Sequence, residues 1–343
     1  MNMAAPSLAP DKHPAMEVLI QPLQRLLSVR PGVNLLEALR ENQVPISYSC
    51  TAGRCGTCRC KVIEGEVLES GHDSVRPQGV QDRFVLACQT YLTESCTIEV
   101  PEPDEVVVHP ARIIKATVAS IEDMTHDIKR LRLEPAKPLA YSPGQYAQLQ
   151  FTPALVRPYS MAGLAGDGML EFHTRLVPGG RVTGYIANQL KPGDQVRVSG
   201  PMGSAYLRRK HTGPMLCVAG GTGLAPILSI IRGTAQAGMA NPVHLYFGVR
   251  SARDVYGMNW LHELRERHPA LQVHVVVTAG EHGHTHRAGL VTDAIAQDWR
   301  ELRGWRAYLC GSPPMVEATT LLTQQKGVAP EQIYADAFYN SAS

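Results

Sequence analysis

Several features that would assign the protein to a common class are missing from its 343 residues. No run of about eighteen apolar residues occurs, so we do not expect a membrane-spanning helix. A net charge of only +2 gives no sign of a nucleic-acid surface or an acidic tail. Residues 1–15 hold three prolines and no apolar stretch, so we interpret them as a disordered extension, not a secretory signal. We therefore expect a cytoplasmic protein, long enough for two or three domains.

Cysteine is also sparse, with eight in the chain, yet four of them fall in the segment SYSCTAGRCGTCRC, residues 47–60. Three have the spacing C-x4-C-x2-C, and another lies 29 intervening residues further on. This spacing is typical of plant-type [2Fe–2S] clusters, in which each iron takes two thiolates. Glycines between the ligands let backbone N–H groups approach the sulfurs. We predict four cluster ligands: Cys50, Cys55, Cys58 and Cys88.

Three alternatives to an iron–sulfur cluster are weaker but open. A structural zinc site usually has paired C-x2-C knuckles, and only one such pair occurs here. Disulfides would need an oxidising compartment, for which no export signal is present. Chance spacing is the third alternative. Cys60, Cys96 and Cys217 fit no ligand position, and we interpret them as small buried hydrophobic residues.

Composition divides the chain into three predicted domains. Residues 100–113, VPEPDEVVVHPARI, contain three prolines and several acids and are typical of a linker. We expect a first domain at 16–105, a second at 106–210 and a third at 211–343. The first carries 13 acids and 8 bases, whereas residues 106–343 carry 17 acids and 24 bases. The opposite net charges of these two segments indicate that the segments dock on each other or bind partners of different charge. Ordinary scatter of solvated surface charges explains the difference about equally well.

The last two domains have different strand patterns. Residues 112–206 hold short alternating runs separated by turn signals such as SPGQ, PGG and KPGD, which predicts a small antiparallel barrel. From residue 215 onward, continuous apolar runs alternate with helical stretches. That alternation is the signature of a parallel α/β sheet with helices on both faces.

The barrel segment contains RPYS, residues 157–160, followed by FHTRLVPGGRVTGYI, residues 172–186. A glycine pair that opens a helix is a suitable anion site, so residues 179–183 are candidates to hold a pyrophosphate, with Arg157 as a bidentate partner. Tyr159 is suited to stacking on an aromatic ring whose edge Ser160 contacts. The alternative is a surface arginine and a core tyrosine. The predicted cofactor residues here are Arg157, Pro158, Tyr159, Ser160, His173, Gly180, Arg181, Val182 and Thr183.

A glycine-rich turn follows the first strand of the last domain, in MLCVAGGTGLAPILSI, residues 215–230. Strand, glycine turn and helix together form the phosphate-binding end of a parallel sheet. The sequence lacks Gly-Lys-Ser/Thr, which excludes a nucleotide-hydrolysing P-loop; a merely tight turn is the alternative. We expect the strand to end at Ala219 and the helix to begin near Pro226. The predicted dinucleotide residues are Gly220, Gly221, Thr222, Gly223, Pro226, Arg250, Cys310 and Gly311.

Together the three motifs resemble the flavoprotein reductases of aromatic-ring dioxygenase systems. The likeness extends from Met16 to about Tyr339 and is strongest in ISYSCTAGRCGTCRCKVIEG, RPYSMAGL, GPMLCVAGGTGLAPILSI and IYADAFY. It implies a β-grasp plant-type ferredoxin domain, a FAD-binding barrel and a Rossmann-like NAD domain. It also implies that Ser160, Cys310, Asp336 and Phe338 surround the reacting rings, although the chain continues five residues beyond Phe338.

The resemblance implies an activity as well. A nicotinamide gives a hydride to FAD, which releases electrons singly to the [2Fe–2S] cluster, and the cluster reduces a Rieske ferredoxin or a terminal oxygenase. The stretch VVTAGE lacks the arginine typical of NADPH enzymes and favours NADH, although Arg250 and Arg253 leave NADPH open. The alternatives are a reductase for a diiron hydroxylase or a deoxysugar dehydratase, and a non-catalytic electron carrier or redox sensor.

Overall fold

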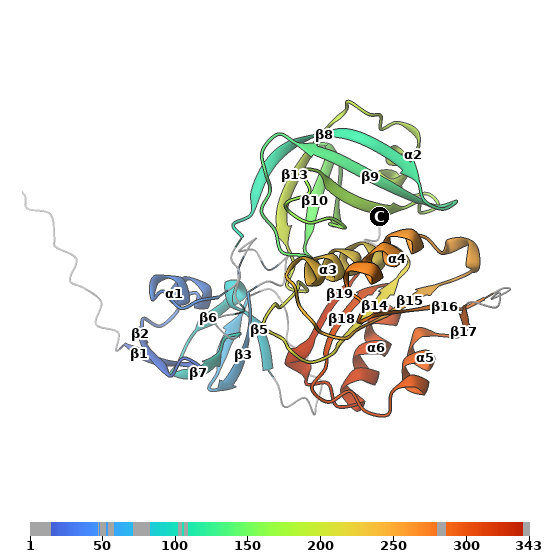
Figure 1. The fold of residues 1–343 in the computed structure, drawn as a ribbon. Coiled ribbons are helices and arrows are strands. Elements are labelled where there is room, and N and C mark those ends of the chain that lie inside the picture. Colours follow the sequence, from blue (N-terminus) through green and yellow to red (C-terminus); the bar gives the residue numbers. More distant parts are fainter. Residues whose placement is uncertain are drawn as a thin grey trace, which may run out of the picture. The chain divides into compact units, whose positions relative to one another are not determined.

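The computed structural model describes residues 15–46, 48, 53, 58–70, 83–101, 105, 109–279 and 286–338. The chain divides into two compact units, 1–108 and 109–343 (Figure 1). In the described ranges, every helix is too short or too polar to cross a membrane.

The first unit is a mixed sheet with one main helix. Its elements are β1 (Met16–Gln21), β2 (Arg25–Val29), α1 (Leu35–Glu41), β3 (Arg59–Glu64), β4 (Val67–Glu69), β5 (Arg83–Leu86), η1 (Ala87–Gln89), β6 (Thr90–Leu92) and β7 (Cys96–Glu99). Five strands pair in the order β2-β1-β7-β3-β5, and β4 and β6 form a separate two-stranded sheet. β1 runs parallel to β7 and antiparallel to β2, which is the β-grasp arrangement.

Helix α1 covers the core of this unit. The side-chain oxygen of Asn34 accepts hydrogen bonds from the N–H groups of Leu36 and Glu37, which caps the helix at its N-terminus. Leu35 and Leu39 are fully buried against strand residues that alternate inward along β1. The side-chain amide of Asn34 also donates to the carbonyl of Cys88, so the cap ties α1 to the segment that holds a predicted cluster ligand.

The second unit begins with an antiparallel barrel. Its elements are β8 (Arg112–Asp123), β9 (Ile128–Pro135), β10 (Tyr146–Thr152), β11 (Leu155–Ser160), β12 (Leu170–Arg175), α2 (Arg181–Asn188) and β13 (Gln195–Met202). The strands pair in the order β11-β10-β13-β8-β9-β12. A bridge between Met161 and Phe172 brings the two edge strands together, which closes the barrel around residues such as Leu131 and Leu149.

The remainder of this unit is a six-stranded parallel sheet. Its elements are β14 (Met215–Gly220), η3 (Gly221–Gly223), α3 (Leu224–Gln236), β15 (Val243–Val249), η4 (Ala252–Asp254), α4 (Met258–Arg267), β16 (Leu271–Val277), β17 (Arg287–Ala288), α5 (Val291–Asp298), β18 (Arg306–Gly311), α6 (Pro313–Gln325), η5 (Pro330–Gln332) and β19 (Ile333–Ala337). The strand order is β17-β16-β15-β14-β18-β19. Helices α3 and α4 cover one face, and α5 and α6 cover the other (Figure 1). The α3 helix begins at Leu224, two residues before the predicted start.

Candidate functional site

Two of the four predicted cluster ligands, Cys50 and Cys55, lie outside the described residues. The other two, Cys58 and Cys88, are buried at the ends of neighbouring strands. The backbone N–H of Cys88 donates to Sγ of Cys58 at 3.4 Å, and that of Gly53 donates to Sγ of Cys88 at 3.2 Å. Donors aimed at sulfur stabilise a thiolate that is bound to iron. The sulfur environment therefore fits a [2Fe–2S] cluster.

Glycine is required at position 53. Its φ is +72°, in the left-handed region, and a Cβ there would lie 2.7 Å from Cγ of Gln89. The Gln89 side chain in turn donates to the carbonyl of Cys88 at 3.0 Å. A larger residue at position 53 would therefore be strained by its backbone conformation and would push the Gln89 side chain aside.

Three of the other four described thiols, Cys60, Cys96 and Cys217, are enclosed in apolar cores. Burial raises the pKa of the Cys96 thiol to about 11 and that of Cys217 to about 12. The pKa of Cys60 is raised further, by burial and by its neighbour Cys58. These three thiols stay protonated at neutral pH and pack as small hydrophobic groups.

Strand β11 carries the predicted flavin residues of the RPYS motif. Arg157 and Tyr159 share one face of the strand, because side chains alternate, and both are partly buried. Tyr159 packs against the barrel core, and burial raises its pKa to about 12. Pro158 is exposed on the opposite face, whereas Ser160 there is buried. The barrel core thus holds the aromatic ring of Tyr159 in place, where it is suited to stacking.

Ser160 joins the barrel to the last strand of the parallel sheet. Its hydroxyl donates to Oδ2 of Asp336 at 3.2 Å, across 176 positions of sequence. Asp336 lies opposite Cys310 in the register of β18 and β19, and the N–H of Phe338 donates to the carbonyl of Gly311 at 2.8 Å. The structure therefore brings together all four residues predicted at the reacting rings.

Burial raises the pKa of Asp336 to about 6, and the hydrogen bond from Ser160 opposes the rise only in part. Cys310 is fully buried beside it, and its pKa is raised by burial and by the Asp336 charge. A carboxyl that titrates near neutrality at the junction of two domains is typical of a functional site.

This raised pKa predicts a pH-dependent stability. Because the folded-state pKa lies above the ordinary value, ionised Asp336 destabilises the fold, and the penalty is complete above pH about 6 and gone below about 4. We expect Asp336→Asn to raise Tm relative to the parent at pH 8, to keep about half of that advantage at pH 5 and to lose it below pH about 4, measured by thermal unfolding.

The matched control is Asp298→Asn. Burial alone would raise the pKa of Asp298, but hydrogen bonds from Arg287 and Tyr246 lower it below its usual value. Ionised Asp298 therefore stabilises the fold, and its replacement should lower Tm at both pH 5 and pH 8. A pH-independent difference for Asp336→Asn would contradict the prediction.

The N-terminus of α2 follows the glycine pair predicted to hold a pyrophosphate. Gly179 has φ +71° and Gly180 is the N-cap, without a side chain that caps the helix. The N–H groups of Arg181 and Val182 thus belong to the first turn, which is suited to an anion. The Thr183 hydroxyl accepts from the N–H of Val177 at 3.2 Å and so holds the preceding loop in place.

Close approach of two loops explains the glycines of the predicted dinucleotide site. A Cβ on Gly223 would lie 2.2 Å from the carbonyl oxygen of Cys310, and one on Gly311 would lie 3.0 Å from Cα of Gly220. The turn after β14 therefore packs directly on the end of β18. Thr222 lies within that turn and Pro226 in the first turn of α3, where proline is well tolerated.

Arg250 lies at the end of β15, next to the end of β16. It is exposed, and its carbonyl accepts from the N–H of Ala279 at 2.8 Å. Arg253 is exposed in the following turn, η4. Both cations thus lie at the carboxyl edge of the sheet, where ligands bind in such folds.

His173 is enclosed between the barrel and α4. Its Nδ1 lies 3.0 Å from the Tyr256 hydroxyl, its Nε2 lies 3.2 Å from Glu171, and its ring stacks on Trp260. Burial opposes ionisation of Glu171, but hydrogen bonds from His173 and Arg130 lower its pKa to about 2. The predicted role of His173 at the cofactor stays a prediction.

Arg175 is a residue that the sequence interpretation missed. Its Nη1 lies 3.5 Å from where a Cβ on Gly221 would stand, so the guanidinium reaches the glycine turn. Its Nε donates to Asp127 at 2.8 Å. The sequence feature that could have identified Arg175 is its position at the end of FHTR, shortly before the glycine pair at 179–180.

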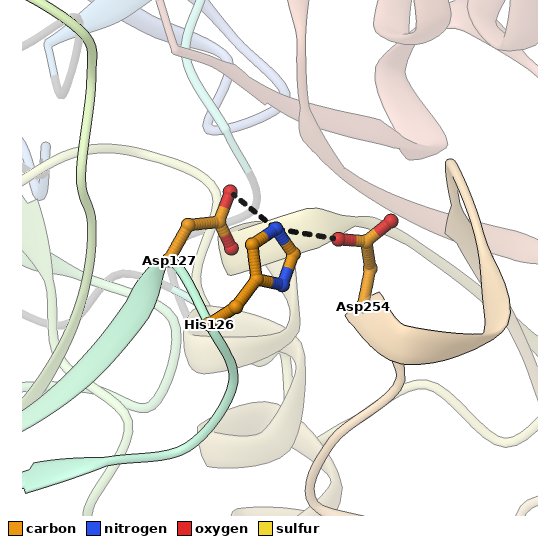
Figure 2. A group of neighbouring side chains, drawn as sticks. All are labelled: His126, Asp127 and Asp254. Atoms are coloured by element: carbon orange, nitrogen blue, oxygen red, sulfur yellow. Dashed lines mark ion pairs between the residues drawn. The ribbon is translucent and has the colours of Figure 1, made fainter.

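Figure 2 shows His126, Asp127 and Asp254, a group that includes the aspartate paired with Arg175. Nε2 of His126 lies 3.9 Å from a carboxylate oxygen of Asp127 and 3.7 Å from one of Asp254. His126 and Asp127 belong to the barrel and Asp254 to η4, so these contacts link the two. The three ligand atoms come within 4.8 Å of one another. Asp127 already pairs with Arg175, and Asp254 accepts from the Ser251 hydroxyl at 2.7 Å. We interpret the group as support for Arg175.

Three family models match the chain in order. They are the 2Fe-2S iron-sulfur cluster binding domain at residues 18–93, the oxidoreductase FAD-binding domain at 115–206 and the oxidoreductase NAD-binding domain at 217–320. Each match falls inside one of the three predicted domains, although their boundaries stay predictions. The [2Fe–2S] cluster, FAD and NAD(P)H are thus the cofactors of this chain.

Similar proteins cover nearly the full length. The chain is 59% identical to the ferredoxin–NAD(P)+ reductase component of naphthalene 1,2-dioxygenase/salicylate 5-hydroxylase systems from Ralstonia sp., over 95% of this chain and 99% of that protein. It is 58% identical to the corresponding component of the naphthalene 1,2-dioxygenase system of Pseudomonas putida, over 94% and 99%. The chain belongs to the family of ferredoxin–NAD(P)+ reductase components.

Solved structures support the same architecture for this reductase. A crystal structure of the Amycolatopsis cytochrome P450 reductase GcoB matches with a TM-score of 0.71 and 34% identity, over 95% of this chain and all of that one. A ferredoxin reductase in carbazole 1,9a-dioxygenase matches with a TM-score of 0.65 and 28% identity, over 95% and 98%. The predicted fold class, with ferredoxin, barrel and NAD domains, is confirmed.

Proposed function

We propose that the reductase takes a hydride from NADH onto FAD and delivers single electrons through its cluster to a Rieske ferredoxin or oxygenase of an aromatic-ring dioxygenase system. The hydrogen bond between Ser160 and Asp336 carries this proposal, because it joins the predicted flavin strand to the dinucleotide sheet. The names of the two naphthalene dioxygenase relatives support the choice of acceptor. The cytoplasm, where NADH is plentiful, is the compartment we propose.

The residues at this junction have roles in binding and orientation. Arg157 and the first turn of α2 would hold the FAD pyrophosphate, and Tyr159 would stack on the flavin ring. Ser160 and Asp336 would contact the ring edge, with a proton available on the Asp336 carboxyl below pH about 6. When bound, FAD supplies the change from a two-electron to a one-electron carrier.

An anaerobic spectrum tests this proposal. We expect the purified protein to show flavin and iron–sulfur bands and both to bleach when NADH is added. Bands that persist after NADH would reject the reductase and favour an electron carrier or sensor. Reductases of diiron hydroxylases would also bleach, so the acceptor is then tested by reduction of a Rieske ferredoxin.

The coenzyme preference is tested at the carboxyl edge of the sheet. We expect Arg250→Ala with Arg253→Ala to raise KM for NADPH by about tenfold and to leave KM for NADH within about twofold, because only NADPH has a 2′-phosphate for these cations. Steady-state kinetics with ferricyanide as acceptor measure both values.

Arg175→Gln is the matched comparison for these variants. Arg175 reaches the glycine turn, and we propose that it contacts the pyrophosphate, which both coenzymes share. Its replacement should therefore raise both KM values by a similar factor. An unchanged NADPH to NADH ratio in the double variant would remove the proposed role of Arg250 and Arg253.

A further inference from the structure

The small sheet formed by β4 and β6 exposes an apolar pair. Leu68 lies directly opposite Tyr91 in the antiparallel register, so their side chains share one face. Leu68 is 60% exposed and Tyr91 is 37% exposed, whereas Val67 and Leu92 on the other face are buried. Single exposed apolar residues are ordinary, but a leucine paired with an aromatic ring forms a continuous patch.

One end of this sheet is attached to the cluster segment. The N–H of Ser70, just after β4, donates to the carbonyl of Gln89 at 2.8 Å, and the Gln89 amide donates to the carbonyl of Cys88 at 3.0 Å. Tyr91 follows Cys88 by three positions in the chain. A protein that sits on the Leu68–Tyr91 face would therefore lie close to a predicted ligand of the cluster.

The other end of the same sheet is acidic. Glu66 immediately precedes β4, and its N–H donates to the Glu94 carboxylate at 2.8 Å. The Glu66 side chain is 63% exposed and pairs with Arg83. Residues 16–105 as a whole carry 13 acids against 8 bases. A partner with an apolar spot bordered by lysine and arginine would complement this face.

We propose that the Leu68–Tyr91 face is the surface on which the electron-accepting protein docks, and that this partner is a redox protein with an apolar centre and a basic rim. The inference rests on the proposed function, because it assumes that the cluster is the exit for electrons. Apolar contact at the centre supplies affinity, and the carboxylates steer the approach.

The test uses the full-length protein with all cofactors and cytochrome c, a basic haem protein, as the acceptor. We expect Leu68→Gln with Tyr91→Gln to raise KM for cytochrome c by about tenfold. Glu66→Gln should weaken the dependence of the rate on salt. NADH should bleach the cluster of each variant at the parent rate in stopped flow, which shows that the domain is folded and the internal transfer intact.

Leu26→Gln is the control, because Leu26 is 57% exposed on the edge strand β2 of the same domain and should leave KM unchanged. The rate that persists in Cys58→Ser is subtracted as direct reduction by the flavin. An unchanged KM for cytochrome c in the Leu68→Gln, Tyr91→Gln variant, with cluster bleaching at the parent rate, would overturn the proposal. Slower bleaching of the cluster in that variant would also overturn it, because the two side chains would then serve electron transfer within the chain. Absence of bleaching in the parent would instead reject the proposed function.

Discussion

Replacing Cys58 with serine is expected to abolish the cluster-dependent reduction of a one-electron protein acceptor and to leave only slow direct reduction by the flavin. Serine is a poor ligand for iron, and Cys58 also accepts the N–H of Cys88, so the variant loses a predicted ligand and a contact between two ligand segments. The iron–sulfur absorption should disappear while the flavin bands remain. NADH oxidation with ferricyanide should persist, because that acceptor takes electrons from the flavin.

Cys60→Ala provides the matched control. Cys60 is two positions away and equally buried, but it is predicted to be an apolar core residue. We expect the iron content of the Cys60→Ala variant, and its rate of acceptor reduction, to match those of the parent. Loss of the cluster in Cys60→Ala and its retention in Cys58→Ser would overturn the predicted ligand set.

The second large effect is expected for Gly223→Ala. Position 223 has φ −58°, which alanine adopts without strain, so any effect comes from the added methyl group. That methyl would stand 2.2 Å from the Cys310 carbonyl oxygen, and the turn after β14 would have to move away from the end of β18. We expect a loss of stability of about 3 kcal/mol and at least a roughly tenfold rise in KM for NADH.

Thermal unfolding and steady-state kinetics measure these two changes. Gly166→Ala is the control, because an added Cβ there meets nothing within 4 Å and the residue lies on the surface. The iron–sulfur bands should be intact in both variants, since the cluster segment lies in the other unit. Parent-like KM and Tm for Gly223→Ala would show that the loops have room to separate.

The sequence by itself determined what depends on local pattern. Cysteine spacing predicted the type of cluster, and strand periodicity predicted the barrel and the parallel sheet. Glycine turns before α2 and after β14 predicted phosphate sites, because tight turns and close backbone approach require residues without side chains. The order of the motifs indicated the family, which the relatives confirm.

Only the tertiary structure decided which distant residues meet. The contact between Ser160 and Asp336 spans 176 positions, and the approach of Arg175 to Gly221 joins the barrel to the sheet. The register of β4 and β6 likewise places Leu68 opposite Tyr91. Periodicity shows which face of a strand is buried but not what packs on it. Long-range contacts arise from how whole elements pack, and no local signal encodes them.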